Sequence, residues 1–110
     1  MLIFKCKDYI EMVYVKIIPS KSKGKKYTAI FYDKDKKKVK TTHFGATGYS
    51  DYTQHKDPER KQKYIERHKN NENWNDYKSA GSLSRFILWN QPTFEASKKS
   101  FANKFGLKLI

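Results

Sequence analysis

The chain has 110 residues, which is enough for one domain with a modest hydrophobic core and too few for two. Its 24 lysines and arginines against 11 aspartates and glutamates give a formal net charge of +13 and a pI near 9.8, which favours phosphate-bearing partners. Phe, Tyr and Trp make up 15% of the residues, which argues against disorder and predicts a largely aromatic core.

The cysteine content and the charge pattern indicate the cellular compartment in which the protein is expected. Cys6 is the only cysteine, so an intramolecular disulfide and a four-cysteine zinc site are excluded, as expected for a reducing compartment. Charged residues such as Lys5, Asp8 and Glu11 interrupt the apolar N-terminal stretch and prevent it from forming a signal peptide or a membrane span. We therefore expect an intracellular protein that is not secreted.

Three strands are predicted in residues 1–44. Residues 9–18, YIEMVYVKII, are rich in β-branched and aromatic side chains, and Pro19 ends their hydrogen-bonded pairing. Residues 27–32, YTAIFY, and 39–44, VKTTHF, form the second and third strands, joined as a hairpin by the turn at 33–38.

The two loops between these strands are rich in lysine: SKSKGKK at 20–26 and DKDKKK at 33–38. The first 40 residues hold 12 basic side chains against four acidic ones, a net charge of +8. Lysines projecting from both loops of one sheet predict an edge that faces phosphates. The alternative is that lysine at hairpin tips only keeps the loops in water and discourages association of sheet edges.

Residues 42–57, THFGATGYSDYTQHKD, join the strands to the helices and contain no Val, Leu or Ile. Ser50 and Asp51 predict a turn in which their side chains satisfy nearby backbone amides. Tyr49 and Tyr52 are the candidate contact residues, because rings near cations suit single-stranded nucleic acid or a protein partner.

A basic helix is predicted from residue 58 to about residue 70. Asp57 is its expected N-cap, and Pro58 suits the first helical position. The narrow apolar side of this helix consists of Tyr64, Ile65 and His68. Trp74 follows in a polar loop, where it either covers the core or contacts a partner.

Two more helices are expected near the C-terminus. A helix at 79–90 buries Leu83, Phe86 and Ile87, and the next begins at Thr93, presents Phe94, Phe101 and Phe105, and ends at Gly106. Residues 107–110 predict a short final strand. The expected fold is α+β: an antiparallel sheet of three or four strands packed on two or three helices. The predicted core consists of Phe31, Phe86, Ile87, Trp89, Phe94 and Phe101.

No motif predicts an enzyme, a cofactor, a metal or a small-molecule substrate. His43, His55 and His68 do not form a close ligand pair; His43 is expected on the surface and His68 as a hydrogen-bonded core residue. Residues 44–47, FGAT, preceded by Tyr27 and Tyr32 are similar to the second motif of GIY-YIG nucleases. No arginine lies between Thr47 and His55, where that family usually has one, so nuclease activity is a remote alternative.

A second resemblance covers residues 27–105. It rests on His43-Phe44-Gly45, Gly48-Tyr49-Ser50-Asp51-Tyr52-Thr53, His55-Lys56-Asp57, Arg60-Lys61, Tyr64, Arg67-His68, Trp74, Ala80-Gly81, Leu83-Ser84-Arg85 and Ile87-Leu88-Trp89. In this order they resemble an uncharacterised family of nucleocytoplasmic large DNA viruses, with Phe86 where tryptophan is expected. The resemblance implies a viral origin and carries no activity.

Two non-enzymatic hypotheses follow. In the first, a virion protein binds DNA phosphates without reading sequence, through Lys21, Lys23, Lys25, Lys26, Lys36, Lys37, Lys38, Arg60, Lys61 and Lys63. In the second, a minor capsid or cement protein contacts shell proteins through its basic loops and through aromatic side chains, of which Tyr49, Tyr52, Trp74 and Trp89 are the candidates.

Overall fold

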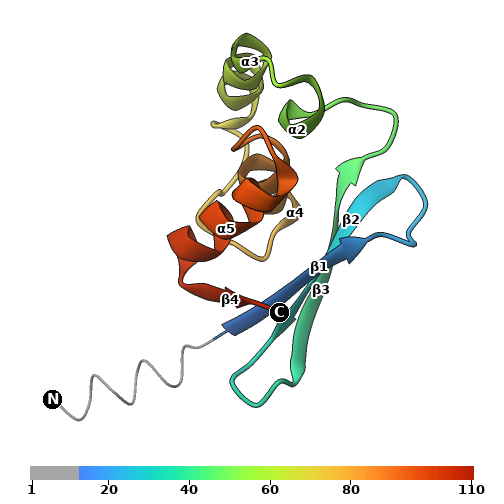
Figure 1. The fold of residues 1–110 in the computed structure, drawn as a ribbon, viewed down its shortest axis with the longest axis vertical. Coiled ribbons are helices and arrows are strands. Elements are labelled where there is room, and N and C mark those ends of the chain that lie inside the picture. The colour runs from blue at the N-terminus through green and yellow to red at the C-terminus, as the bar shows by residue number, and fades with distance from the viewer. Residues whose placement is uncertain (1–12) are drawn as a thin grey trace, which may run out of the picture.

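The computed structural model describes residues 13–110 (Figure 1). Its elements are β1 (Val13–Pro19), β2 (Lys25–Tyr32), β3 (Lys38–Ala46), α2 (Tyr52–His55), α3 (Pro58–His68), α4 (Ala80–Leu83), the π-helix η1 (Ser84–Leu88), α5 (Phe94–Phe105) and β4 (Leu107–Leu109). A sheet packed against C-terminal helices confirms the α+β class. Residues 9–12 of the first predicted strand, and Cys6, lie outside the described residues.

The sheet has four strands in the order β3-β2-β1-β4. β1 and β2 pair antiparallel, as do β2 and β3, whereas β4 pairs parallel to β1. The predicted antiparallel pairing is confirmed for the first three strands, whereas the fourth strand is added in parallel, so the sheet is mixed. The helices carry the chain back along the sheet, so β4 begins near the start of β1 and runs in the same direction (Figure 1).

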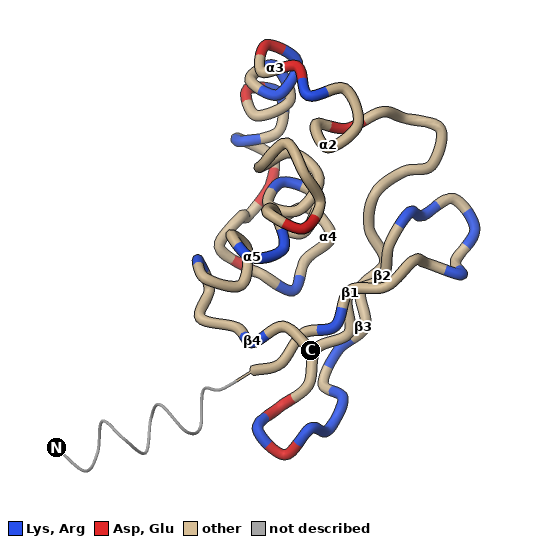
Figure 2. Tube along the Cα trace, in the orientation of Figure 1, with Lys and Arg blue, Asp and Glu red and all other residues tan. Residues whose placement is uncertain are grey.

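The two lysine-rich loops lie at opposite ends of this sheet (Figure 2). In an antiparallel meander each strand reverses direction, so the β1–β2 connection at one end is followed by the β2–β3 turn at the other. The single lysine-lined edge predicted from the sequence is therefore not formed. The basic side chains are divided between two sites separated by the length of a strand.

Helices cover one face of the sheet, where the core lies. The buried cluster consists of Val15, Ala29, Phe31, Phe44, Leu83, Ile87, Leu88 and Phe101. Phe31, Ile87 and Phe101 were predicted correctly. Phe86, Trp89 and Phe94 pack against this cluster but remain partly exposed, because they lie at its margin.

The predicted helix at 79–90 is interrupted by a π-helical turn. Ser79 caps α4, and the chain then widens in η1, where the amide of Trp89 donates to the carbonyl of Ser84 at 3.1 Å. A turn bonded from i to i+5 places Leu83 and Leu88 one above the other. Both are buried, so this turn directs onto the sheet two leucines that a regular helix would separate.

The remaining helix ends follow the sequence signals. Asp57 accepts from the amides of Glu59 and Arg60 at the start of α3, Thr93 accepts from Ala96 at the start of α5, and Gly106 ends α5 with φ of 67°. α3 ends at His68, two residues earlier than predicted. Within residues 13–110 no helix combines the length and the apolar character that a membrane span requires.

Candidate functional site

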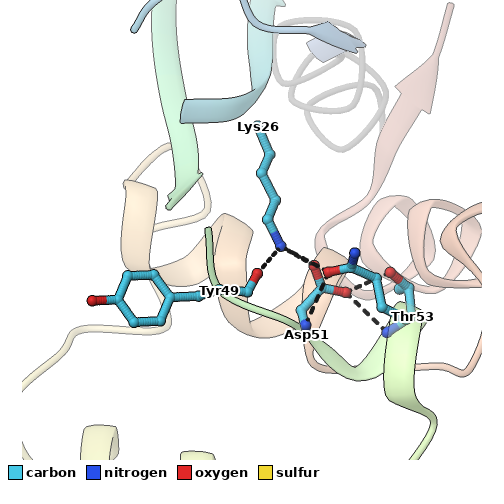
Figure 3. Close-up of polar contacts among 5 residues, drawn as sticks. Lys26, Tyr49, Asp51 and Thr53 are labelled. Atoms are coloured by element: carbon cyan, nitrogen blue, oxygen red, sulfur yellow. Dashed lines mark hydrogen bonds and ion pairs between the residues drawn. The ribbon is translucent and has the colours of Figure 1, made fainter. Parts of the chain in front are cut away.

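Residues 47–57 join β3 to α3 and are anchored by a buried ion pair (Figure 3). The Lys26 ammonium donates to Asp51 Oδ2 at 2.7 Å, to the Tyr49 carbonyl at 2.6 Å and to Gln54 Oε1 at 3.0 Å. Asp51 is only 3% exposed. The junction is therefore fixed to β2 by one lysine whose hydrogen-bonding capacity is used within the protein.

Asp51 also begins the short helix α2. Its carboxylate accepts from the Thr53 amide and hydroxyl, and Gln54 Oε1 accepts from the Asp51 amide at 3.1 Å, which completes a capping box. The predicted turn chemistry is confirmed for Asp51, but the helix that Asp51 starts was not predicted. Because Lys26 stabilises this cap, it is a poor candidate for phosphate binding.

A cleft of about 490 Å³ opens beside this junction. One wall consists of Lys25 and Gly45 at the end of the sheet together with residues 49–51. The other consists of α3 and of the segment from α4 to η1. Its volume lies in the range of roughly 300–1,000 Å³ that is typical of ligand sites.

α3 contributes four side chains to the cleft: Arg60, Tyr64, Arg67 and His68. These positions are separated by four, three and one residues, so they share one face of the helix. Tyr64 is buried, whereas Arg60 and Arg67 are exposed at the rim. Arg67 was not predicted as a site residue, although its spacing of seven residues from Arg60 indicates that both lie on one face of the helix.

Aromatic rings stack beside the cleft. Tyr64 lies flat against Trp89, with centroids 4.4 Å apart and an interplanar angle of 3°, and it also stacks on His68 at 4.3 Å. Burial, assisted by the charge of Glu72, raises the pKa of Tyr64 to about 12. The phenol therefore stays neutral and serves as packing surface.

The acidic side chains of the cleft are paired. Asp51 is bound by Lys26, and Glu72 Oε2 lies 2.8 Å from His68 Nδ1. Glu72 fits here because Gly81 has no side chain: a Cβ at that position would overlap the carboxylate. Neither carboxylate is left open towards the cleft.

The predicted phosphate contacts fall into three separate groups. Lys21, Lys23 and Lys25 are exposed at one end of the sheet, Lys36, Lys37 and Lys38 at the other, and Arg60 and Lys63 on α3. Lys61 is half-buried: it donates to the Asn90 carbonyl at 2.7 Å and lies over the Tyr52 ring at 4.9 Å. Burial, followed by the charge of Arg85, lowers the pKa of Lys61. The contacts with Asn90 and Tyr52 engage its ammonium within the protein.

The predicted partner contacts differ in exposure. Tyr49 is 74% exposed, whereas Tyr52 is half-buried under Lys61. Trp74 packs edge-on against Phe86, and the Arg85 guanidinium lies 5.5 Å from its ring. Trp74 therefore covers the core, and Tyr49 is the most exposed of the three rings.

His43 and His68 have separate roles. His43 is exposed and hydrogen-bonds the Thr28 hydroxyl at 2.7 Å, as its predicted surface position allows. His68 is hydrogen-bonded as predicted, but it lines the cleft instead of the core. Across residues 13–110, no three His, Cys, Asp or Glu side chains are grouped closely enough to ligate one metal ion.

The tyrosines of the nuclease hypothesis lie on opposite faces of the sheet. Tyr27 stacks on Phe94 of α5 at 4.6 Å on the helix side. Tyr32 is five residues further along β2, and side chains alternate along a strand, so it faces the other way. The two phenols do not converge on one site.

The face of the sheet opposite the helices was also missed as a candidate surface. Tyr14 pairs with Tyr32 and Lys108, and Tyr32 pairs with Lys38. Paired residues on neighbouring strands share a face, so these four form one row across the sheet. The alternation of Tyr14, Lys16 and Ile18 in β1 was the sequence signal for this second face.

The fold and these two surfaces define a small basic α+β protein with a cation-lined cleft. A family model described as a family of unknown function (DUF5754) matches residues 15–68, which extend from β1 to the end of α3. The chain is similar to that family over this stretch, which includes the sheet-end wall of the cleft and α3 and excludes the segment from α4 to η1. No curated protein matches the chain. No solved structure matches it either.

Proposed function

We propose that this protein binds the phosphate backbone of DNA, independently of sequence, across the face of the sheet that the helices leave uncovered. The observation that carries the proposal is charge distribution. Residues 13–50 contain ten lysines and two acidic residues, Asp33 and Asp35, which both lie in the β2–β3 turn. Phosphate contacts of this kind need positive charge and no base-reading side chains.

Register places part of this charge on that face. Lys38 and Lys108 lie at the two ends of the row that contains Tyr14 and Tyr32. Lys16 follows Tyr14 by two residues in β1 and therefore lies on the same face. The Lys36 ammonium lies 4.7 Å from the centroid of the Tyr14 ring, which holds a further cation over this surface. The described strands contain no Asp or Glu, so these lysines meet no competing carboxylate within the sheet.

The lysine loops extend the same surface at both ends. Lys21, Lys23 and Lys25 flank one end of the sheet and Lys37 the other. Figure 2 shows lysine-coloured segments in both loops. We exclude Lys26 and Lys61 from the surface because both are bonded within the protein. A phosphate backbone lying along the strands would meet both loops in turn.

Fluorescence anisotropy of a labelled duplex, titrated at several salt concentrations, tests this function. Contact with about six phosphates predicts a slope of log Kobs against log salt of about −5. Changing Lys21, Lys23 and Lys25 together to Gln should reduce the magnitude of that slope by about 2 to 3, since each lost contact removes about 0.9.

The matched control changes Lys63, Lys69 and Lys99 to Gln, which removes the same charge from the exposed surfaces of α3, its C-cap and α5. This control should keep nearly the full slope. Absence of binding at low salt would rule out the proposed function. An equal loss in the control would show that only net charge matters and would rule out the sheet face.

A structural role in a viral shell is the second candidate, and the exposure of Tyr49 favours it because an exposed ring beside cations suits a protein partner. In this setting the protein is a virion component made in the host's reducing interior. Locating the protein in purified particles separates the two functions. Ordered positions in the shell support the capsid role, whereas release together with the DNA supports the first proposal.

A further inference from the structure

We propose that the cleft between the sheet end and α3 binds a nucleoside monophosphate, with its phosphate held by Arg60 and Arg67 and its planar base against the aromatic side of the cleft. This site lies between the end of the sheet and α3, and of the residues assigned to the DNA surface it includes only Lys25. It does not depend on that function.

The charge of the cleft selects an anion. Four basic and two acidic side chains line it, which gives a net charge of +2 with His68 neutral and +3 with His68 protonated. Both acidic side chains are paired, Asp51 with Lys26 and Glu72 with His68. A metal ion would find no open carboxylate here, whereas an anion finds unopposed cations.

Three cations remain available to a ligand. Lys25, Arg60 and Arg67 have no carboxylate partner within 4.0 Å among the residues that the structure describes. Arg60 and Arg67 are seven residues apart on one helix face, about 10 Å along the axis, so their long side chains can reach one phosphate from two sides. Guanidinium groups bind phosphate oxygens in pairs, which favours a terminal phosphate with several free oxygens.

The rest of the cleft suits a planar, largely apolar group. Leu88 and Trp89 supply buried or half-buried apolar surface. Tyr64 is stacked between Trp89 and His68, so the ring surface that this stack can offer a ligand is that of His68 at its end. Tyr49 lines the opposite rim with its ring directed away from the Lys26–Asp51 pair (Figure 3). Rings of this kind stack on nucleobases of any identity. The site is therefore expected to recognise the phosphate and a planar ring system and to discriminate little between different bases.

The Lys26 network positions this rim. Lys26 holds the carbonyl of Tyr49 and the carboxylate of Asp51, so the main chain at 49–51 is fixed relative to β2 before a ligand arrives. Fixed geometry lowers the entropic cost of binding. The cleft is therefore preformed on its sheet side, while the exposed arginines are free to close over a phosphate.

NMR titration of the full chain with AMP, inorganic phosphate and adenosine tests the proposal. We expect AMP to shift the amide signals of Tyr49, Arg60, Arg67 and Gly81, with weaker binding of inorganic phosphate and the weakest binding of adenosine. A 5′-phosphorylated trinucleotide distinguishes a free nucleotide from a strand terminus as the natural ligand. Tighter binding of the trinucleotide than of AMP would identify the strand terminus as that ligand.

Arg60→Gln and Arg67→Gln should each weaken AMP binding about tenfold, the worth of one charge-assisted contact of about 1.5 kcal/mol. Both side chains are exposed, so the variants should fold normally, which their melting temperatures would check. Lys63→Gln, on the same helix but outside the cleft, is the matched control and should bind as the parent protein does.

Three results would overturn the inference. The first is no shift of cleft signals at millimolar AMP, and the second is an equal loss of binding in Lys63→Gln. The third is inorganic phosphate binding as tightly as AMP, which would remove the role of the rings. Displacement of duplex DNA by AMP would show one shared site and overturn the separation of the cleft from the sheet face.

Discussion

Lys26 shows how one buried side chain determines the shape of the junction. Its ammonium is bonded to three oxygens and its partner carboxylate is almost fully buried, so removing the lysine leaves Asp51 charged without compensation. In the sequence, Lys26 is one of four lysines in SKSKGKK and is indistinguishable from them. The bonds of Lys26 to Tyr49, Asp51 and Gln54, while Lys25 stays exposed, separate their roles.

Lys26→Met should therefore destabilise the protein by about 3 kcal/mol, the typical cost of breaking a buried ion pair from one side. Urea unfolding measures this loss. The control is Lys63→Met, which breaks the exposed Lys63–Glu59 pair at 3.8 Å and should cost about 0.5 kcal/mol or less. Similar losses in the two variants would contradict a structural role for the Lys26–Asp51 pair.

His55 provides a pH-dependent prediction. Its Nδ1 accepts from the Asp57 amide at 3.0 Å, so the neutral ring carries its proton on Nε2. Burial, followed by the charge of Arg60, lowers the pKa of His55, while Asp57 and Asp51 act in the opposite direction. Imidazole NMR should show this histidine titrating below the value of about 6.5 for a free side chain.

The sign of the effect on stability follows from that shift. Below about pH 6.5 the unfolded chain binds a proton at His55 more readily than the folded protein does. Stability is therefore fully present above that pH and falls as pH decreases through the folded pKa. In His55→Gln this part of the decrease should disappear; an unchanged pH profile between pH 7.5 and 5 would contradict the prediction.

At the level of elements, Gly45 links the end of β3 to η1. Its φ is +80°, and a Cβ there would lie 2.8 Å from Leu88 Cδ1 and 3.3 Å from Lys26 Cβ. Gly48 has a similar φ of +87° but nothing within 4 Å. Substitutions at these two glycines therefore distinguish the cost of backbone strain from the cost of close packing.

Gly48→Ala should cost about 1 kcal/mol from backbone strain alone, and Gly45→Ala about 2 kcal/mol because the methyl group also overlaps Leu88. The difference of about 1 kcal/mol corresponds to about 4 °C in melting temperature for a domain of this size. Calorimetry of both variants measures it. Equal losses would mean that Leu88 moves aside and that β3 and η1 are not tightly packed.

Elements with strong local signals were predictable from sequence, and those set by tertiary packing were not. Asp57-Pro58, Thr93 and Gly106 mark helix ends through their own chemistry, and the structure uses all of them. The π-turn of η1 carries no local signal, because it results from the need to bury both Leu83 and Leu88 on one sheet. α2 was missed for a different reason: its four residues are too few to show helical periodicity.

At the scale of the whole molecule, topology decides which residues share a surface. The sequence correctly predicts strands rich in lysine, but pairing order places the two loops at opposite ends of the sheet and β4 beside β1. Lys108 thereby joins Lys16 and Lys38 on one face, although some 90 residues separate the first two in the chain. The cleft likewise combines β2, α3 and η1, which no local pattern connects.

The separation of the loops predicts how DNA binding depends on duplex length. The eight residues of β2 span about 26 Å, which equals about 8 base pairs of B-DNA at 3.4 Å each. A duplex of about 6 base pairs should reach the lysines of one loop at a time, whereas one of about 16 should engage both. The magnitude of the salt slope should therefore rise across this range and then remain constant, as anisotropy at several salt concentrations would show. In the Lys21, Lys23 and Lys25 triple Gln variant most of the rise should be lost, because the lysines that remain on this surface, Lys16, Lys36, Lys37, Lys38 and Lys108, lie on the strands and at the β2–β3 end. A slope independent of length in the parent protein would mean that the two loops do not act on the same duplex.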